Sequence, residues 1–241
     1  RELRNREIDM VYLPNTRWFV GEEAKDDAAE RLANQLAGLA DIYVNDAFGS
    51  WQAHASTVRI SHYLPSYAGF LLQKEIENLD RIYEARKPMV SVVAGSKFDT
   101  KIDSLYALLD KSDYLVLGGV IYNAYLAAKY GFRIKGLDED DVKLAAMFVD
   151  KAKQYGDKLV ELPYIVESDS IEGKFDGQYR IHDIRTLKAG TELNWVLDVA
   201  AESFHDAHVK DVFLKAQTIF VNAVMGYTPY FNDGTIALDS L

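Results

Sequence analysis

Two lysines follow a predicted buried strand at 89–95, at a point where an anion would meet both positive charge and accessible backbone. Gly95 lets a ligand approach the main chain closely, and Lys97 and Lys101 stand four residues apart where the helix expected over 99–110 begins. Lysines at a helix N-terminus oppose the helix dipole, so an anion between them would relieve that conflict. The pattern indicates a phosphate-binding turn, although two solvated lysines on an ordinary turn fit it equally well. It is not a Walker A loop, because no GxxxxGK[ST] occurs.

Two other predicted strands also end in residues that could take part in binding a ligand. Gly118 and Gly119 close the strand expected over 113–119, and their missing side chains leave room for a planar base or a sugar. Asn222 stands at the tip of a later strand. A double glycine is common after strands and an asparagine there often serves the turn, so each signal alone is weak.

Other side chains offer less. Arg17 follows a strand predicted over 8–14 and has the planar fork that binds a carboxylate or a phosphate, but an isolated arginine more often forms a surface ion pair. His205 and His208 are three residues apart without a nearby third ligand, so no metal site is expected. The absence of cysteine removes thiolate nucleophiles and disulfides.

The elements that must position these residues alternate along the chain. Short aliphatic runs alternate with amphipathic stretches, which predicts a parallel sheet covered by helices on both faces. Ligands of such sheets bind at the carboxyl ends of the strands. The polar stretch 168–192 is expected to form a hairpin or a loop. Strands are predicted over 8–14, 41–48, 89–95, 113–119, 158–168, 194–200 and 217–224, and helices over 25–39, 70–86, 99–110, 121–130, 139–155, 201–215 and from 234.

Composition limits the class of protein. The chain has 241 residues, 49% of them hydrophobic and 27% charged, with net charge −10. Such a chain can bury a core, and its acidity argues against a nucleic-acid partner. It contains no apolar run long enough for a membrane helix, and its first residues do not resemble a signal peptide. We therefore expect a cytoplasmic protein with no membrane or nucleic-acid partner.

The strands are distributed unequally. Residues 88–241 hold enough predicted strands for an independent α/β domain, whereas residues 1–66 hold too few. The first segment is therefore either an incomplete piece of a domain or a segment that docks on the second. The predicted helix at 70–86 lies between them.

Five longer segments carry a pattern that can be compared as a whole. They are PNTRWFVGEE (14–23), ADIYVNDAFGSWQAHAST (40–57), HYLPSYAGFLLQKEIENL (62–79), AGSKFDTKIDSLYALLDKSDYLVLGG (94–119) and VNAVMGYTPYFNDGT (221–235). Taken in order, they resemble the phosphoglycerate kinase family. The segment 94–119 is similar to the family's GGAKVSDKI…LLDKVDKLIIGGG region, and the segment 221–235 is similar to its WNGPMGVFE…GT.

The resemblance implies an α/β fold of two Rossmann-like parallel-sheet domains joined by an interdomain helix, with the first domain incomplete here. It divides the chain into part of the phosphoglycerate domain (1–69), the interdomain helix (70–87) and the nucleotide-binding domain (88–241). It also implies a monomer that transfers a phosphoryl group between 1,3-bisphosphoglycerate and magnesium-ADP, giving 3-phosphoglycerate and ATP.

The resemblance further implies roles for single residues. Lys97 and Lys101 would act in catalysis by meeting the nucleotide phosphates and the transferring group, and Arg17 would hold the phosphoglycerate. Magnesium would come with ATP or ADP, and no side chain is assigned as its ligand. The nucleotide pocket would be formed by Gly95, Lys101, Gly118, Gly119, Asn222 and Gly226.

Several positions depart from the family pattern. Gln52 stands where a substrate-binding arginine is expected, and glutamine supplies neither the charge nor the paired donors; Arg59 is the nearest replacement. Ala223-Val224 replaces Gly-Pro, and Pro229 replaces a ribose-binding glutamate. The family's N-terminal substrate segments and its terminal glycine-rich phosphate loop have no counterpart in the sequence. A divergent enzyme, a non-catalytic relative that binds nucleotide or a partner protein, and an unrelated α/β nucleotide-binding module remain as alternatives.

Overall fold

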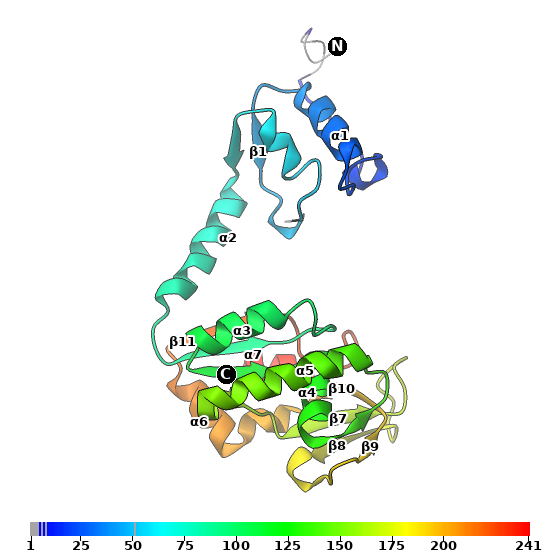
Figure 1. Cartoon of the computed structure of the whole chain (residues 1–241), viewed down its shortest axis with the longest axis vertical. Helices are drawn as coiled ribbons and strands as arrows, with labels where there is room; N and C mark the ends of the chain where they lie inside the picture. The colour runs from blue at the N-terminus through cyan, green and yellow to red at the C-terminus, as the bar shows by residue number, and fades with distance from the viewer. Residues whose placement is uncertain (1–4, 6, 8, 51) are drawn as a thin grey trace. The chain divides into compact units, whose positions relative to one another are not determined.

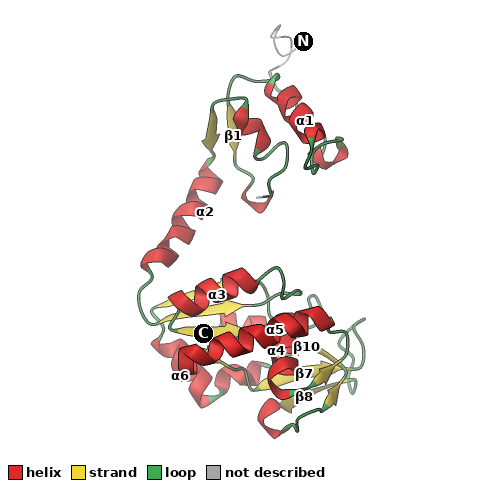
Figure 2. Cartoon of the chain, viewed as in Figure 1, coloured by secondary structure: helices red, strands yellow, loops and turns green. Residues whose placement is uncertain are grey.

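The structure is a computed structural model that describes residues 5, 7, 9–50 and 52–241. The chain divides into two compact units, Arg1–Glu84 and Ala85–Leu241, each of which is described by itself (Figures 1 and 2). Both units combine helices with parallel strand pairs, so the chain is a mixed α/β protein. Among the described residues, no helix combines the length and the apolar character needed to cross a bilayer.

The first unit has a small core beside a two-stranded parallel sheet. The side chain of Asp26 begins the first helix by accepting a hydrogen bond from the Ala28 N–H at 2.9 Å. That helix packs its alanines and Leu32 against Ala55. The elements are α1 (Asp27–Ala37), β1 (Tyr43–Asn45), β2 (Ser66–Ala68), α2 (Phe70–Asp80) and the 3₁₀ helices Thr16–Trp18, Phe48–Ser50, Arg59–His62 and Arg81–Glu84.

The strand predicted over 8–14 is wrong for residues 9–14, and Ile8 lies outside the described residues. Met10 and Tyr12 are 79% and 92% exposed. A strand needs a hydrogen-bonding neighbour, and in the described part of this unit β1 and β2 pair with each other. An apolar run indicates burial only where such a partner exists.

The second unit is built on a four-stranded parallel sheet in the order β11-β3-β4-β6. All five residues of β3 are buried, as expected for a strand covered on both faces. α3 and α5 lie side by side along this sheet (Figure 1). The elements are β3 (Met89–Val93), α3 (Ile102–Lys111), β4 (Tyr114–Leu117), α4 (Gly119–Tyr130), α5 (Glu139–Ala152), β6 (Leu159–Val160), α6 (Ala207–Lys215), β11 (Thr218–Asn222) and α7 (Asp233–Asp239).

A second, antiparallel sheet in the order β10-β7-β8 packs into the same unit. The stretch 168–192, expected to form a hairpin or a loop, supplies one strand of a hairpin, β8, and the partner strand β7 lies almost entirely before it. The alternation of strands and helices in the sequence did not separate β7 and β10 from the parallel sheet. The strands are β7 (Tyr164–Ser168), β8 (Tyr179–Asp183) and β10 (Trp195–Val199), and β5 (Arg133–Ile134) pairs with β9 (Glu192–Leu193).

Three long helices were predicted to be longer than they are. α2 ends at Asp80 and α5 at Ala152, each followed by a 3₁₀ turn. The helix expected over 201–215 is divided, because Asp206 breaks from helical geometry and its side chain accepts from the His208 N–H at 3.1 Å, which starts α6 afresh.

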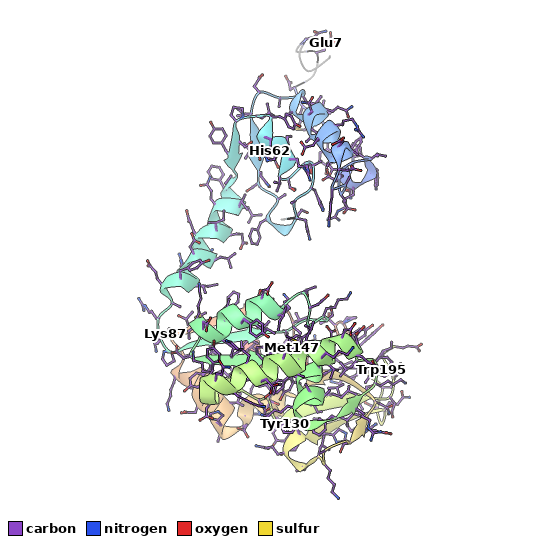
Figure 3. The ribbon with its side chains drawn as sticks, viewed as in Figure 1. Glu7, His62, Lys87, Tyr130, Met147 and Trp195 are labelled. Carbon is purple, nitrogen blue, oxygen red and sulfur yellow. The ribbon has the colours of Figure 1, made fainter. Side chains whose placement is uncertain are left out.

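Carboxylates that are partly or fully buried connect neighbouring elements of this unit. Glu161 accepts hydrogen bonds from Tyr125, Lys129 and Tyr130, the last labelled in Figure 3, at 2.7–2.8 Å. Its contacts fasten the end of α4 to the segment that follows β6. In the antiparallel sheet, Glu167 connects neighbouring strands in a similar way.

Glu167 is 4% exposed and lies on β7, the central strand between β8 and β10. Its oxygens take hydrogen bonds from the Asn194 N–H at 2.6 Å, from His182 Nε2 at 2.6 Å and from Arg180 at 2.7 Å. Burial alone would raise the pKa of Glu167, but these three donors together hold it below its usual value. The ionised carboxylate therefore stabilises the fold.

We expect Glu167→Gln to lower the free energy of unfolding at pH 7 by about 2–4 kcal/mol, because it leaves buried donors unpaired. The matched control is Glu192→Gln, which removes an exposed ion pair with Arg133 and should change the free energy of unfolding by less than about 0.5 kcal/mol. A carboxyl group whose pKa is lowered in the folded state stabilises the fold fully above its unfolded-state pKa, and this stabilisation is lost as the pH falls through the folded-state pKa. The difference in free energy of unfolding between wild type and Glu167→Gln should therefore shrink below about pH 4. Urea unfolding followed by circular dichroism measures both, and equal losses for the two variants would contradict the assignment.

Candidate functional site

The strand order of the parallel sheet reverses at β3. From β3 the chain proceeds through β4 to β6 on one side, whereas β11 pairs with β3 on the other side. The carboxyl ends of β3 and β11 therefore flank a topological switch point, the position where open α/β sheets bind ligands. The two strand ends stay together beyond the sheet, because the Ala94 N–H donates to the Asn222 carbonyl at 2.9 Å.

Glycines bring three strand-end loops into contact at this edge. A Cβ on Gly119, whose φ is +62°, would lie 2.8 Å from the Gly95 carbonyl oxygen. A Cβ on Gly118 would lie 3.1 Å from both the Ala94 Cβ and the Met225 Cγ. From the sequence we expected room for a base or a sugar at these two glycines, but protein atoms occupy that space. Their role in the structure is to let the loops after β3, β4 and β11 pack closely.

Lys101 and Asn222 meet across this edge, as the sequence motifs expected of residues in one pocket. The Lys101 Nζ donates to the Asn222 Oδ1 at 2.5 Å. Lys101 is the residue that precedes α3, and Asn222 is the last residue of β11. A lysine ammonium has three donors, so this bond leaves two for a further acceptor. The half-buried Lys101 side chain is thereby aimed at the switch point.

Lys97 lies on the turn between β3 and α3, exposed and without an ion-pair partner among the described residues. The turn itself is rigidly held. Phe98 is fully buried, with its ring edge-on to Phe148 at 5.8 Å between centroids. The Asp141 Oδ1 accepts hydrogen bonds from the Phe98 N–H at 2.9 Å and the Asp99 N–H at 3.4 Å. The turn thus presents a free cation on a fixed backbone.

Sequence reasoning missed Asp141. It stands 43 residues from Phe98 in the chain, within the acidic first turn of α5, where a carboxylate is expected to serve its own helix. The one indication in the sequence was the aromatic residue Phe98 between the two lysines, because its burial requires the turn to be held in place.

The loop after β11 is fastened to two other elements. The Met225 N–H donates to the Thr235 Oγ1 at 2.9 Å, and the Tyr227 N–H donates to the Leu197 carbonyl at 2.7 Å. Gly226 lies in this loop between the two fastened residues, and a Cβ there would come within 2.1 Å of the Phe231 carbonyl oxygen. The path of the chain here admits glycine alone at position 226. Pro229 follows on the exposed side of the same loop.

Arg17 lies in the first unit on a 3₁₀ turn, about half exposed. Its Nε pairs with Glu23 at 3.2 Å, and the His54 Nε2 lies 4.0 Å from the same glutamate oxygen. This is the surface ion pair that the sequence offered as the alternative to an anion site. An anionic ligand of Arg17 would have to compete with Glu23.

The loop that carries Gln52 is ordered by a buried carboxylate that the sequence did not single out. Glu22 is 2% exposed and accepts from the Ser56 N–H at 3.1 Å and from its hydroxyl at 2.5 Å. Gln52 is exposed on this loop. Arg59 is bound to Glu30 rather than free to replace the cation missing at position 52.

Metal ligands do not gather in the part of the chain that the structure describes. It contains no cluster of three or more histidine, aspartate or glutamate side chains able to hold an ion. His205 and His208 are both exposed.

Ala223, directly after β11, has a φ of +71°, a left-handed conformation that costs a residue with a Cβ about 1–2 kcal/mol. We therefore expect Ala223→Gly to raise the free energy of unfolding by up to about 1 kcal/mol. Ala128→Gly, in the ordinary helical geometry of α4, should lower it by about 1 kcal/mol. Thermal unfolding of both variants tests this opposition in sign, and a loss of stability in Ala223→Gly would contradict it.

Known proteins resemble this chain along nearly its whole length. The sequence pattern of the family described as phosphoglycerate kinase matches residues 1–241. A phosphoglycerate kinase of Moorella thermoacetica is 39% identical over 199 residues, covering 81% of this chain and 48% of the relative. One of Parasynechococcus marenigrum is 35% identical over 237 residues, covering 95% of this chain and 56% of the relative.

Solved structures agree. The phosphoglycerate kinase of Coxiella burnetii superposes with a TM-score of 0.70 at 33% identity, over 94% of this chain and 57% of that one. The chain spans about half the length of the relatives that it matches. The ordered motifs, the α/β architecture and these matches lead to one conclusion: the chain belongs to the phosphoglycerate kinase family.

Proposed function

We propose that the complete protein, a cytoplasmic monomer, transfers a phosphoryl group between 1,3-bisphosphoglycerate and magnesium-ADP, giving 3-phosphoglycerate and ATP. In this proposal residues 88–241 bind the nucleotide, residues 1–69 contribute to the phosphoglycerate site, and residues 70–87 are the interdomain helix. Family membership supports the reaction class. The observation that carries the proposal is the bond between the Lys101 Nζ and the Asn222 Oδ1 at the switch point.

That bond suits a site for nucleotide phosphates. Asn222 holds the ammonium of Lys101 at the carboxyl ends of β3 and β11 before any ligand arrives, so little side-chain freedom is lost on binding. Lys97 adds a second, exposed cation on a turn whose backbone is fixed. Gly118, Gly119 and Gly226 let the surrounding loops pack closely, and in this proposal they and Gly95 line the pocket in which one phosphate chain would meet both lysines.

Phosphoryl transfer asks of these residues positioning and neutralisation of charge, because the moving group is close to metaphosphate in character. Lys101 would hold the phosphate next to the transferring group, and Lys97 would neutralise charge that develops on the equatorial oxygens. Magnesium enters as the nucleotide complex and supplies further charge neutralisation when bound. Arg17 would bind the carboxylate or phosphate of the three-carbon acid in place of Glu23.

Two observations favour a second candidate, a non-catalytic relative that binds nucleotide. Gln52 lacks the charge expected of a substrate-binding arginine, and the nearest arginine, Arg59, is paired with Glu30. Arg17 is also neutralised, by Glu23. Both candidates share the nucleotide site of the second unit and differ only in turnover.

We expect Lys101→Ala to weaken magnesium-ADP binding by about 10-fold or more, because a hydrogen bond to a charged group contributes roughly 1.5–3 kcal/mol. The matched control is Lys153→Ala, which removes an exposed lysine paired with Asp150 on α5 and should leave affinity unchanged. Isothermal titration calorimetry on the 241-residue chain measures both. Equal affinity of wild type and Lys101→Ala would remove Lys101 from the site.

A coupled assay of ATP formation by the complete protein separates the two candidates. An enzyme should turn over 1,3-bisphosphoglycerate and should lose roughly 10²-fold or more in kcat in Lys97→Ala, since a donor that stabilises transition-state charge is worth that much. Absence of turnover in a protein that still binds magnesium-ADP would support the non-catalytic candidate instead.

A further inference from the structure

Asp198 is a buried carboxylate that the proposed reaction does not use. It lies near the end of β10 and is 4% exposed. Its Oδ1 accepts a hydrogen bond from the Val199 N–H at 2.8 Å, and its Oδ2 accepts one from the Gly234 N–H at 3.2 Å. The carboxylate therefore reaches from β10 to the start of α7, 36 residues further along the chain.

The start of α7 depends on this distant group. Asn232, the residue that precedes α7, makes no side-chain capping bond within the described chain. Asp198 supplies the acceptor from another element, so it caps α7 in place of the local residue. Unpaired N–H groups at the start of this helix would otherwise be buried without an acceptor.

The same carboxylate fits between Gly226 of the proposed nucleotide site and Gly234 of α7. A Cβ on Gly226 would lie 2.7 Å from the Asp198 Cγ, and a Cβ on Gly234 would lie 2.8 Å from its Oδ1. The loop from Asn222 to Tyr227 is tied on either side of this point, to Leu197 beside Asp198 and to Thr235 of α7. Asp198 therefore lies where the loop, β10 and α7 meet.

The charges around Asp198 are few. α7 presents Asp233, which carries a like charge and is itself paired with Lys174. β7 presents the uncharged Val166 opposite Asp198, and α4 presents the amide of Asn123, bound to the Val196 carbonyl. Burial, reinforced by Asp233 and opposed by the N–H donors, raises the pKa of Asp198 to about 6.

Building on the proposed nucleotide function, we propose that Asp198 is a positioning residue: in its ionised form it fixes Gly226 and the start of α7, and thereby holds Asn222 where it orients Lys101. Protonation converts one acceptor oxygen into a hydroxyl and removes the charge that attracts the N–H groups. The loop then loses the contact that joins β10 to α7, and nucleotide affinity falls.

The two consequences of this titration have opposite signs. A carboxyl pKa raised above its unfolded value means that the folded state binds the proton more tightly, so this group favours folding increasingly as pH falls through about 6. Nucleotide affinity falls over the same interval. A residue that affected only the free energy of unfolding would leave the nucleotide affinity of the folded chain unchanged over this interval.

The test measures magnesium-ADP binding by calorimetry on the 241-residue chain between about pH 5 and pH 8, for wild type and Asp198→Asn. The titration of ADP itself cancels in the ratio of the two dissociation constants. We expect the variant to bind about fivefold more weakly at pH 7.5, the value of roughly one hydrogen bond, and the ratio to approach one near pH 5 with a midpoint near pH 6. Asp157→Asn, an exposed control, should give a ratio of one throughout.

A second variant keeps the test decisive if Asp198→Asn does not fold. Asp233→Asn removes the like charge beside Asp198, so the pH at which affinity falls should move downward relative to wild type. A ratio independent of pH, or an unmoved midpoint in Asp233→Asn, would overturn the role of Asp198 while leaving the nucleotide site intact. Absence of ADP binding by wild type at every pH would overturn the proposed function itself, and the inference with it.

Discussion

The hydrogen bond between Lys101 and Asn222 joins residues 121 positions apart and connects the start of α3 to the end of β11 in the second unit. It forms only because β11 pairs with β3 in register, so that both strands end at one edge. The approach of the loops also requires glycine at 119, where φ is +62° and a Cβ would lie 2.8 Å from the Gly95 carbonyl oxygen, and it leaves little room for a side chain at 118. Sheet order, glycine placement and one charged side chain thus act as a single constraint, because a change in any of them separates Lys101 from Asn222.

The cations of the two units differ in how they are held. In the second unit Lys101 is paired with a neutral amide, which orients the ammonium without cancelling its charge. In the first unit Arg17 and Arg59 are paired with the carboxylates of Glu23 and Glu30, which cancel theirs. An anion is therefore attracted directly to the lysine, whereas at the arginines it must first displace a carboxylate. This contrast is the physical reason why the proposed nucleotide site has more structural support than the proposed phosphoglycerate site.

The sequence predicted the elements whose signals are local. The buried strands before Gly95 and Gly118, and the amphipathic helices after them, follow from periodicity and from glycine at the strand ends. It could not separate the antiparallel β10 from the parallel strands, because both are short apolar runs. Nor could it find Asp141 or Asp198, whose partners lie 43 and 36 residues away and are created only by packing. The family resemblance, not their spacing in the sequence, assigned Lys101 and Asn222 to one proposed nucleotide site, and the structure brings their side chains into contact.

Hydrogen exchange of the 241-residue chain with and without magnesium-ADP tests most directly whether the switch point is the nucleotide site. Amides that lie under bound phosphates exchange more slowly, because opening of the loop must compete with the ligand. The account predicts slowed exchange in 94–101, 118–121 and 222–227 together, with no change in the hairpin of β7 and β8. Protection confined to other segments, with these three loops unaffected, would contradict it.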